Sequence, residues 1–197
     1  MKLDKEKTAE VVQNLLVSHP KLWDLDFPYR YTVETIIKKG GKTIDKYLTP
    51  FGIRSVKFDK DKGFFLNNKH LKLKGMCLHQ DAGCLGTAVP DRAYERRLLI
   101  LKEFGTNAIR CSHNPPSPEF LNYCDSIGFL VIDEAFDKWK SGYYEEFFDS
   151  SWQQDISDMV IRDRNHPSVI LWSIGNELAE AKLKDDTGIE RAGMLQD

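Results

Sequence analysis

The sequence lacks the features that define several protein classes. No apolar run reaches about 18 residues, which excludes a transmembrane helix, so no membrane partner is expected. The first residues, MKLDKEKTAE, are charged and lack the apolar core of a signal peptide, which favours a cytoplasmic location over secretion. Neither charge sign dominates, because the formal net charge is −2, so no nucleic-acid partner is indicated.

Motifs for metal, redox and nucleotide binding are also missing. The stretch GCLGTA at 83–88 matches neither G-x-G-x-x-G nor the P-loop, so a nucleotide-binding fold would lack its phosphate cradle. The four cysteines form no C-x-x-C pair, which argues against a zinc site or a dithiol motif. In a chain of this size without a secretion signal, we expect buried thiols rather than disulfides at Cys77, Cys84, Cys111 and Cys124.

The part of the chain before residue 60 has the pattern of short β-strands. YRYTVETII (29–37) and FGIRSVKFD (51–59) are predicted strands, and the two glycines of KKGGK (38–42) predict a hairpin turn. FDKDKG (58–63) is predicted to be a charged turn or linker. This region is typical of the end of an antiparallel sandwich, and so few strands cannot bury two faces by themselves.

After residue 63, strands and helices alternate. The helix 117–128 is predicted to begin with Ser117 as its cap and to end in Gly128. A helix over 151–165 ends at His166-Pro167, because the residue before proline avoids the helical region. A third helix is predicted over 91–105, with Asp91 able to cap its start. The predicted strands are 71–79, 107–112, 129–135 and 168–174.

The order β-α-β-α-β-α-β with nearly continuous apolar strands is typical of a parallel sheet covered by helices. Both a doubly wound sheet and a (β/α)8 barrel fit this order. In a barrel, the active site lies at the C-terminal ends of the strands. Each predicted strand does end in polar residues there: HQD (79–81), RCSHN (110–114), DEAFDKW (133–139) and GNE (175–177).

These strand ends indicate sugar chemistry. Glycoside hydrolysis uses two carboxyl groups at the scissile bond, and the site also needs groups that bind hydroxyls and sugar rings. Simpler interpretations stay open for each residue. Glu177 could be a solvated residue opening a helix, and Arg110 could be a structural partner of Asp133 or Glu134. The remaining candidates could pack or hydrogen-bond in the core, namely His79, His113, Trp139 and Trp172.

Three stretches resemble glycoside hydrolase family 2, and most closely its β-galactosidases. They are FFLNNKHLKLKGMCLHQD (64–81), NAIRCSHNPPSPEFLNYCDSIGFLVIDEAFD (107–137) and MVIRDRNHPSVILWSIGNE (159–177), the last being the most specific. The resemblance implies an α/β fold with a (β/α)8 TIM barrel. Residues 1–60 would be the C-terminal part of an immunoglobulin-like sandwich domain. Residues 61–197 would be the N-terminal half of the barrel, with its first four β-α units.

The resemblance also implies roles for single residues. Glu177 matches the general acid/base, Asn176 the residue that binds the sugar 2-hydroxyl, and Arg110 the arginine that supports the nucleophile. His79, Asp81 and His113 match positions lining the sugar subsite, and Asp133 and Trp139 at the same strand ends are further substrate-binding candidates. Magnesium-using members carry Glu and His where this chain has Lys138 and Lys140, so neither a metal nor a cofactor is expected.

The resemblance therefore predicts a retaining hydrolase of terminal β-galactosides, with a carbohydrate as its partner. Since a (β/α)8 barrel takes about 250 residues, we expect a piece that lacks the nucleophile, is inactive alone and associates through open sheet edges or as an oligomer of the full-length enzyme. Three alternatives stay open: a β-glucuronidase or β-mannosidase of the same family, a non-catalytic carbohydrate-binding module, and one subunit of a split enzyme.

Overall fold

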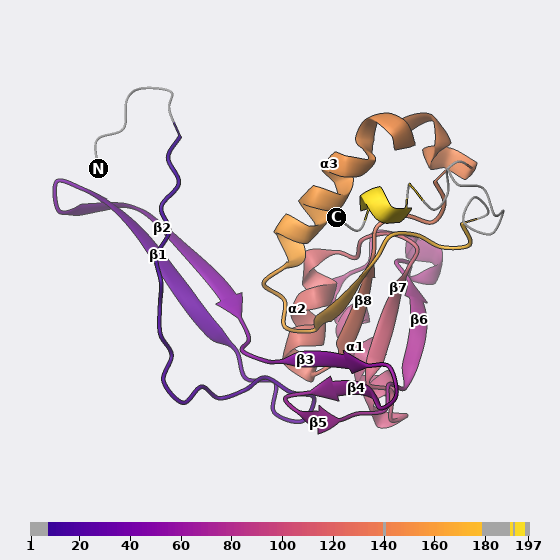
Figure 1. Cartoon of the computed structure of the whole chain (residues 1–197), viewed down its shortest axis with the longest axis horizontal. Coiled ribbons are helices and arrows are strands. Elements are labelled where there is room, and N and C mark those ends of the chain that lie inside the picture. The colour runs from indigo at the N-terminus through magenta and orange to yellow at the C-terminus, as the bar shows by residue number, and fades with distance from the viewer. Residues whose placement is uncertain (1–7, 140, 179–189, 191, 196–197) are drawn as a thin grey trace.

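The computed structural model describes residues 8–139, 141–178, 190 and 192–195. A long β-hairpin extends away from an α/β unit, and a small antiparallel sheet lies between them at one end of that unit (Figure 1). Within the described ranges, none of the helices combines the length and the apolar character that a membrane span requires.

The hairpin consists of β1 (Tyr31–Lys39) and β2 (Lys42–Phe51). Gly40 and Gly41 form its turn with φ of +57° and +80°, the left-handed values that a two-residue hairpin turn of this kind requires. The predicted hairpin is therefore confirmed. With two strands it buries neither face, and apolar side chains on it stay exposed: Ile36, Ile37, Ile44, Tyr47 and Leu48.

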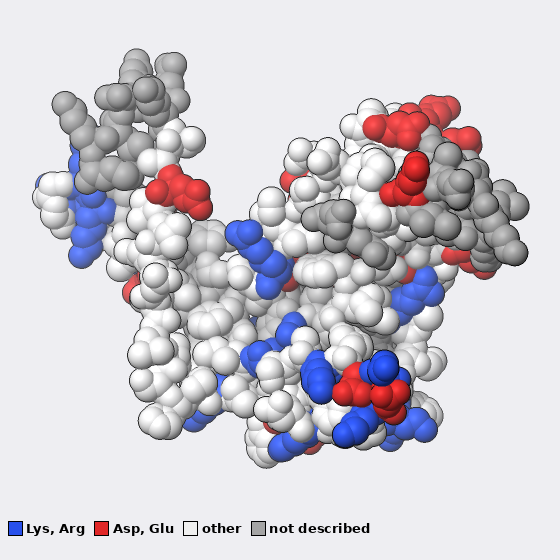
Figure 2. Space-filling view, viewed as in Figure 1, with Lys and Arg blue, Asp and Glu red and all other residues white. Residues whose placement is uncertain are grey.

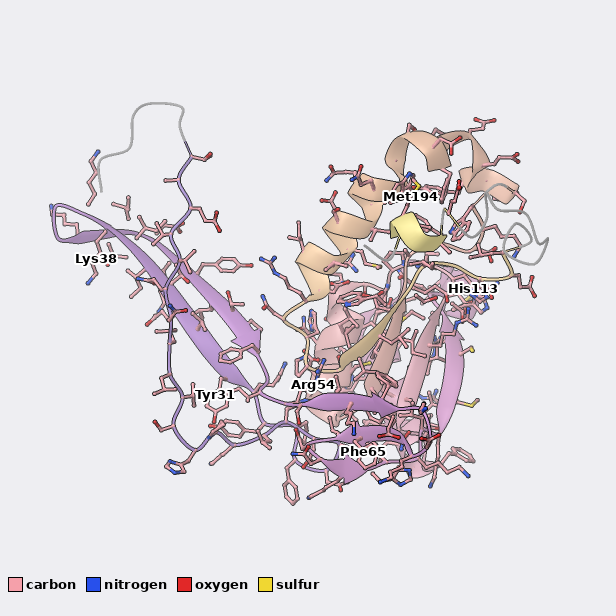
Figure 3. The ribbon with its side chains drawn as sticks, viewed as in Figure 1. Tyr31, Lys38, Arg54, Phe65, His113 and Met194 are labelled. Carbon is pink, nitrogen blue, oxygen red and sulfur yellow. The ribbon has the colours of Figure 1, made fainter. Side chains whose placement is uncertain are left out.

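The predicted strand 51–59 is divided in the structure. Phe51 ends β2, residues 52–55 are irregular, and β3 (Val56–Asp59) begins a sheet with β4 (Gly63–Leu66) and β5 (Lys69–His70). The chain leaves the strand conformation because Arg54, labelled in Figure 3, donates hydrogen bonds to the carbonyls of Pro167 and Val169. Val169 is the first residue of β9 (Val169–Ser173), and Pro167 lies just before it. Of the charged segment 58–63, residues 60–62 form the turn between β3 and β4, and its ends belong to these strands.

The four predicted strands of the second part form one parallel sheet. Its strands are β6 (Gly75–His79), β7 (Ala108–Ser112), β8 (Leu130–Glu134) and β9 (Val169–Ser173), in that order. The strands follow one another without a reversal of order. A reversal is expected at the switch point of a doubly wound sheet, so the sheet fits part of a barrel.

Three helices accompany this sheet: α1 (Asp91–Glu103), α2 (Pro118–Ile127) and α3 (Glu145–Asp163). Short 3-10 turns, η1 (Gly83–Leu85) and η2 (Gly142–Tyr144), precede α1 and α3. The core between the sheet and α1 and α2 contains residues that alternate along the strands and repeat at helical spacing, among them Leu98, Ile109, Cys111, Leu121, Cys124 and Val131. The face drawn in Figure 2 carries both charge signs, with acidic residues gathered around the start of α3.

Besides the divided strand 51–59, element starts differ from the predictions at β6, which begins at Gly75 rather than at residue 71, and at two helices. Ser117 caps α2, its Oγ accepting a hydrogen bond from the Phe120 amide at 3.3 Å, and Gly128 ends the helix with φ of +84°. Pro90 rather than Asp91 is the cap residue of α1. Helix α3 begins at Glu145, six residues before the predicted start at 151, because Phe148 packs into the same aromatic cluster as Trp139.

All four cysteines are free thiols, as predicted. Cys111 and Cys124 are buried, but the prediction of burial is wrong for Cys77 and Cys84. Cys77 lies on the edge strand β6, where most residues are exposed, and Cys84 lies in the short turn η1, which buries none of its residues.

Candidate active site

The carboxyl ends of the four parallel strands meet around Glu134, the last residue of β8. Its side chain is fully buried and accepts hydrogen bonds from β7 and β9. Arg110 donates from Nε at 2.9 Å and from Nη2 at 2.7 Å, and Ser173 Oγ donates at 2.7 Å. His113 Nδ1 lies 2.6 Å from the other carboxylate oxygen. A buried carboxylate needs such partners, so Glu134 fixes the positions of side chains from β7, from the loop after it and from β9.

Arg110 links this network to the residues after β9. Its Nη2 also donates to Asn176 Oδ1 at 3.1 Å, so one guanidinium spans from Glu134 to Asn176. The hydrogen bond to Glu134 raises the pKa of Arg110 above its usual value, although partial burial opposes this. The carboxylate pairing that the sequence left open for Arg110 is therefore present, and its partner is Glu134 rather than Asp133.

Asn176 is held on its other side by Asp137, in the loop after β8. Asn176 donates from its backbone amide to the Asp137 carbonyl at 2.7 Å and from Nδ2 to Asp137 Oδ1 at 2.9 Å. These bonds fix the orientation of the amide, since Oδ1 accepts from Arg110 while Nδ2 donates. The bond from Asn176, together with the nearby Lys138, lowers the pKa of Asp137.

Glu177 follows directly, and its side chain is open to solvent. The Glu177 side chain is 69% exposed, and its backbone has φ of +47°, in the left-handed region. Its Oε2 lies 3.3 Å from Lys138 Nζ, which also lies 3.0 Å from Asp137 Oδ1. The carboxylate at the tip of β9 is therefore accessible to a ligand while it contacts the loop after β8.

The two histidines of the site come from β6 and from the loop after β7. His79 and His113 pack edge to face with ring centroids 5.3 Å apart, and the label of His113 in Figure 3 marks the carboxyl end of the sheet. Asp81 is exposed in the loop after β6, where its carbonyl accepts a hydrogen bond from Arg97 at 2.6 Å. A cavity of about 840 Å³ adjoins this region and is lined by residues that include His113, Phe136, Asp137, Lys138, Tyr144 and Met159.

Two predicted site residues do not join this group. Asp133 precedes Glu134 on β8, so it points to the opposite face of the sheet, where it is fully buried beside Asp163 of α3. Trp139 is fully buried as well, donates from Nε1 to the Ile174 carbonyl at 2.8 Å and packs on Phe148. The packing interpretation that the sequence left open applies to Trp139.

The sequence-based list of site residues missed four members of the group: Glu134, Asp137, Lys138 and Ser173. The sequence signal that could have identified Glu134 is the alternation of side chains between the two faces of the sheet along β8. Arg110 and Glu134 are inward residues of adjacent strands at the same end of the sheet, whereas Asp133 is out of phase. Lys140, the other lysine at a position of the magnesium-using members, lies outside the described residues. Across the ranges that the structure describes, no group of three or more His, Cys, Asp and Glu could hold a metal ion.

Comparison with known proteins gives matches along nearly the whole chain. The family model for the TIM barrel domain of glycosyl hydrolases family 2 matches residues 56–188, and a second glycosyl hydrolases family 2 model matches residues 2–54. A β-galactosidase of Bacteroides ovatus, BoGH2A, is 49% identical over 98% of this chain and 24% of its own length. A putative β-glucuronidase of Formosa agariphila is 43% identical over 88% of this chain and 17% of its own length.

Solved structures agree with these matches. A glycosyl hydrolase family 2 member from Bacteroides cellulosilyticus superposes with a TM-score of 0.83 and 48% identity, over 90% of this chain and 24% of that one. A β-glucuronidase from Ruminococcus gnavus superposes with a TM-score of 0.81 and 31% identity, over 91% of this chain and 31% of that one. The chain spans about a quarter of the length of the curated β-galactosidase that it matches.

Proposed function

Because the chain belongs to glycoside hydrolase family 2, we propose that it carries the general acid/base of a retaining glycosidase acting on terminal β-galactosides. One observation carries this proposal. Glu177 presents an accessible carboxyl group at the tip of β9, next to an amide whose orientation is fixed by Arg110 and Asp137. The C-terminal end of a barrel strand is where catalytic residues of this fold occur.

Glu177 would act in both steps of the reaction. As a carboxylic acid it donates its proton to the glycosidic oxygen while the bond from that oxygen to the sugar breaks. As a carboxylate it then takes a proton from the water that hydrolyses the glycosyl-enzyme intermediate. The mechanism needs a second carboxylate as nucleophile, and we assign that role to none of the described residues.

The other residues of the group would position the sugar and that nucleophile. Asn176 has one amide hydrogen beyond its bond to Asp137 and can bind the 2-hydroxyl. Arg110 binds Glu134 and Asn176 through Nε and Nη2 and also interacts with Cys77, and it would support a second carboxylate through Nη1. His79, Asp81 and His113 would line the sugar subsite. The proposal omits Asp133 and Trp139, since both are buried away from this group.

The second candidate substrate is a β-glucuronide. The Bacteroides ovatus β-galactosidase is 49% identical to this chain. A putative β-glucuronidase of Formosa agariphila is 43% identical, and a β-glucuronidase of Bacteroides fragilis is 35% identical. The greater identity to the β-galactosidase favours the galactoside. The two substrates are distinguished by measuring kcat/KM of the naturally encoded protein on phenyl β-galactoside and on phenyl β-glucuronide. A larger kcat/KM for the glucuronide would reverse the assignment.

The role of Glu177 is tested by Glu177→Gln in the naturally encoded protein. Loss of a general acid costs about 10²- to 10⁴-fold in rate, so hydrolysis of a phenyl glycoside should fall by that factor. A 2,4-dinitrophenyl glycoside has a leaving group that needs no protonation, so its first step should fall far less. The matched control is Glu145→Gln, an exposed glutamate at the start of α3. Equal losses on both substrates, or none, would remove the acid/base role from Glu177.

A further inference from the structure

Lys138 joins the loop after β8 to the tip of β9. Its ammonium lies 3.0 Å from Asp137 Oδ1 and 3.3 Å from Glu177 Oε2. The Lys138 side chain is 30% exposed, whereas that of Glu177 is 69% exposed. Lys138 is therefore the more restrained member of the pair, because it is less exposed and also contacts Asp137. It can restrict the orientation of the more exposed Glu177 carboxylate.

The other charged groups around this pair are already engaged. Arg110 on β7 is bonded to Glu134 and to Asn176, and His113 after β7 is bonded to Glu134. Asp137 contributes a second negative charge close to Glu177, and its Oδ1 receives bonds from both Lys138 and Asn176. Among the described residues, Lys138 is the cation that contacts the Glu177 carboxylate itself.

We propose that Lys138 is a positioning residue for Glu177: its ammonium, held by Asp137 on one side, holds the carboxylate at the carboxyl end of the sheet. This inference rests on the proposed acid/base function of Glu177. Lys138 touches neither of the bonds that change, and it keeps its own three protons throughout. The hydrogen bond to Asp137, and secondarily the one to Glu177, raises the pKa of Lys138, so it stays charged over the working range of a hydrolase.

A general acid works only when its carboxyl group lies within hydrogen-bond reach of the glycosidic oxygen. The Glu177 side chain is largely exposed, and Lys138 bridges it to Asp137, which limits the orientations that the carboxyl group can take. Removing the ammonium should therefore slow the first step for a leaving group that needs a proton.

The test is Lys138→Met in the naturally encoded protein, with kcat/KM measured on a phenyl glycoside and on a 2,4-dinitrophenyl glycoside. We expect kcat/KM for the phenyl glycoside to fall by about 2- to 5-fold, the size that a partly exposed ion pair supports. With the 2,4-dinitrophenyl glycoside it should not change, since that leaving group needs no proton. Lys138→Arg keeps the charge and should keep the original kcat/KM with the phenyl substrate.

The control is Lys57→Met, which removes a lysine that pairs with Asp59 on β3, away from the strand ends. It should leave kcat/KM for both substrates unchanged. An unchanged kcat/KM for the phenyl glycoside in Lys138→Met overturns the role of Lys138, as does an equal loss with both substrates. In that case, an intact Glu177→Gln phenotype would still support the proposed function. A wild-type protein that hydrolyses no aryl glycoside overturns both.

Discussion

Two adjacent carboxyl groups on β8 show how one residue step changes chemistry. Glu134 faces the inner side of the sheet, where Arg110, Ser173 and His113 supply hydrogen bonds. Asp133 faces the helices and lies beside Asp163, whose carboxylate pairs with Arg162. Successive strand residues point to opposite faces, so two acids that look equivalent in the sequence DEA occupy unrelated environments. Glu134 accepts hydrogen bonds from its partners, whereas burial and the neighbouring Asp163 raise the pKa of Asp133.

Asp133 should make the stability of the protein depend on pH. Burial, and then the nearby Asp163, raises the pKa of Asp133 to about 8 in the folded state. The unfolded chain has the ordinary value of about 3.9, so unfolding releases a proton over the window between these values. The contribution of Asp133 is therefore most favourable below about pH 4 and is lost progressively as the pH rises to about 8.

Asp133→Asn removes this ionisation while keeping the size of the side chain. Relative to wild type, the variant should become steadily more stable from about pH 4 to about pH 8. Thermal unfolding at several pH values measures that difference, in which the effects of groups that do not interact with Asp133 cancel. Parallel curves for the two proteins would show that Asp133 ionises normally.

At the scale of elements, helix α2 depends on its ends. Ser117 satisfies the Phe120 amide, and Pro118 occupies the first helical position. Ser117→Ala should cost about 1 kcal/mol of stability, the usual cost of losing a cap. Ser126→Ala on the same helix removes a hydroxyl that bonds only to a carbonyl of the preceding turn, and it should change stability by less than about 0.5 kcal/mol. Thermal unfolding of both variants makes the comparison; equal losses would show that the cap contributes nothing specific.

Local patterns predict such elements well and predict their surroundings poorly. The strands β7, β8 and β9 and the ends of α2 follow from apolar runs, a cap residue and Gly128, all of which are local signals. The irregular segment 52–55 does not, because its conformation depends on Arg54 contacting Pro167 and Val169 more than a hundred positions away. The early start of α3 has the same origin, since Phe148 packs against Trp139 of a preceding loop.

The candidate site shows the same division. The ends of the strands and the resemblance of the GNE stretch identified Arg110, His113, Asn176 and Glu177, which the structure brings together. Asp133 and Trp139 were assigned to the site from their place in the polar run after β8. The register of β8 instead turns Asp133 toward Asp163, and the loop after β8 buries Trp139 in an aromatic cluster. Which residues of a polar run face the site is decided by strand register and by packing, and a single sequence gives neither with certainty at a strand end.

At the scale of the whole molecule, the N-terminal region closes one end of the parallel sheet. Trp23, Phe64 and Leu66 from the first 70 residues pack on Ala108 and Leu130 at the start of β7 and β8. This is the end opposite to Glu134 and Glu177. Within the described residues, β6 and β9 each pair on one side only, so the expected association through sheet edges stays a prediction.

Trp23 should be the main anchor of this closure. Its side chain is fully buried, and Nε1 donates to the Asp125 carbonyl at 2.8 Å, at the end of α2. Trp23→Ala removes both the packing and the bond and should cost about 3–5 kcal/mol. Phe27→Ala, four residues away, removes an aromatic ring that is 75% exposed and should change stability by less than about 0.5 kcal/mol.

Limited proteolysis and thermal unfolding of the naturally encoded protein measure this difference. Trp23→Ala should lower the melting temperature and speed cleavage within residues 20–70, because the small sheet loses its contact with β7 and β8. Trp23→Phe keeps most of the apolar packing but not the hydrogen bond, so it should fall between wild type and Trp23→Ala. If Trp23→Ala and Phe27→Ala behave alike, the region is held by Arg54 and its carbonyl partners rather than by the buried tryptophan.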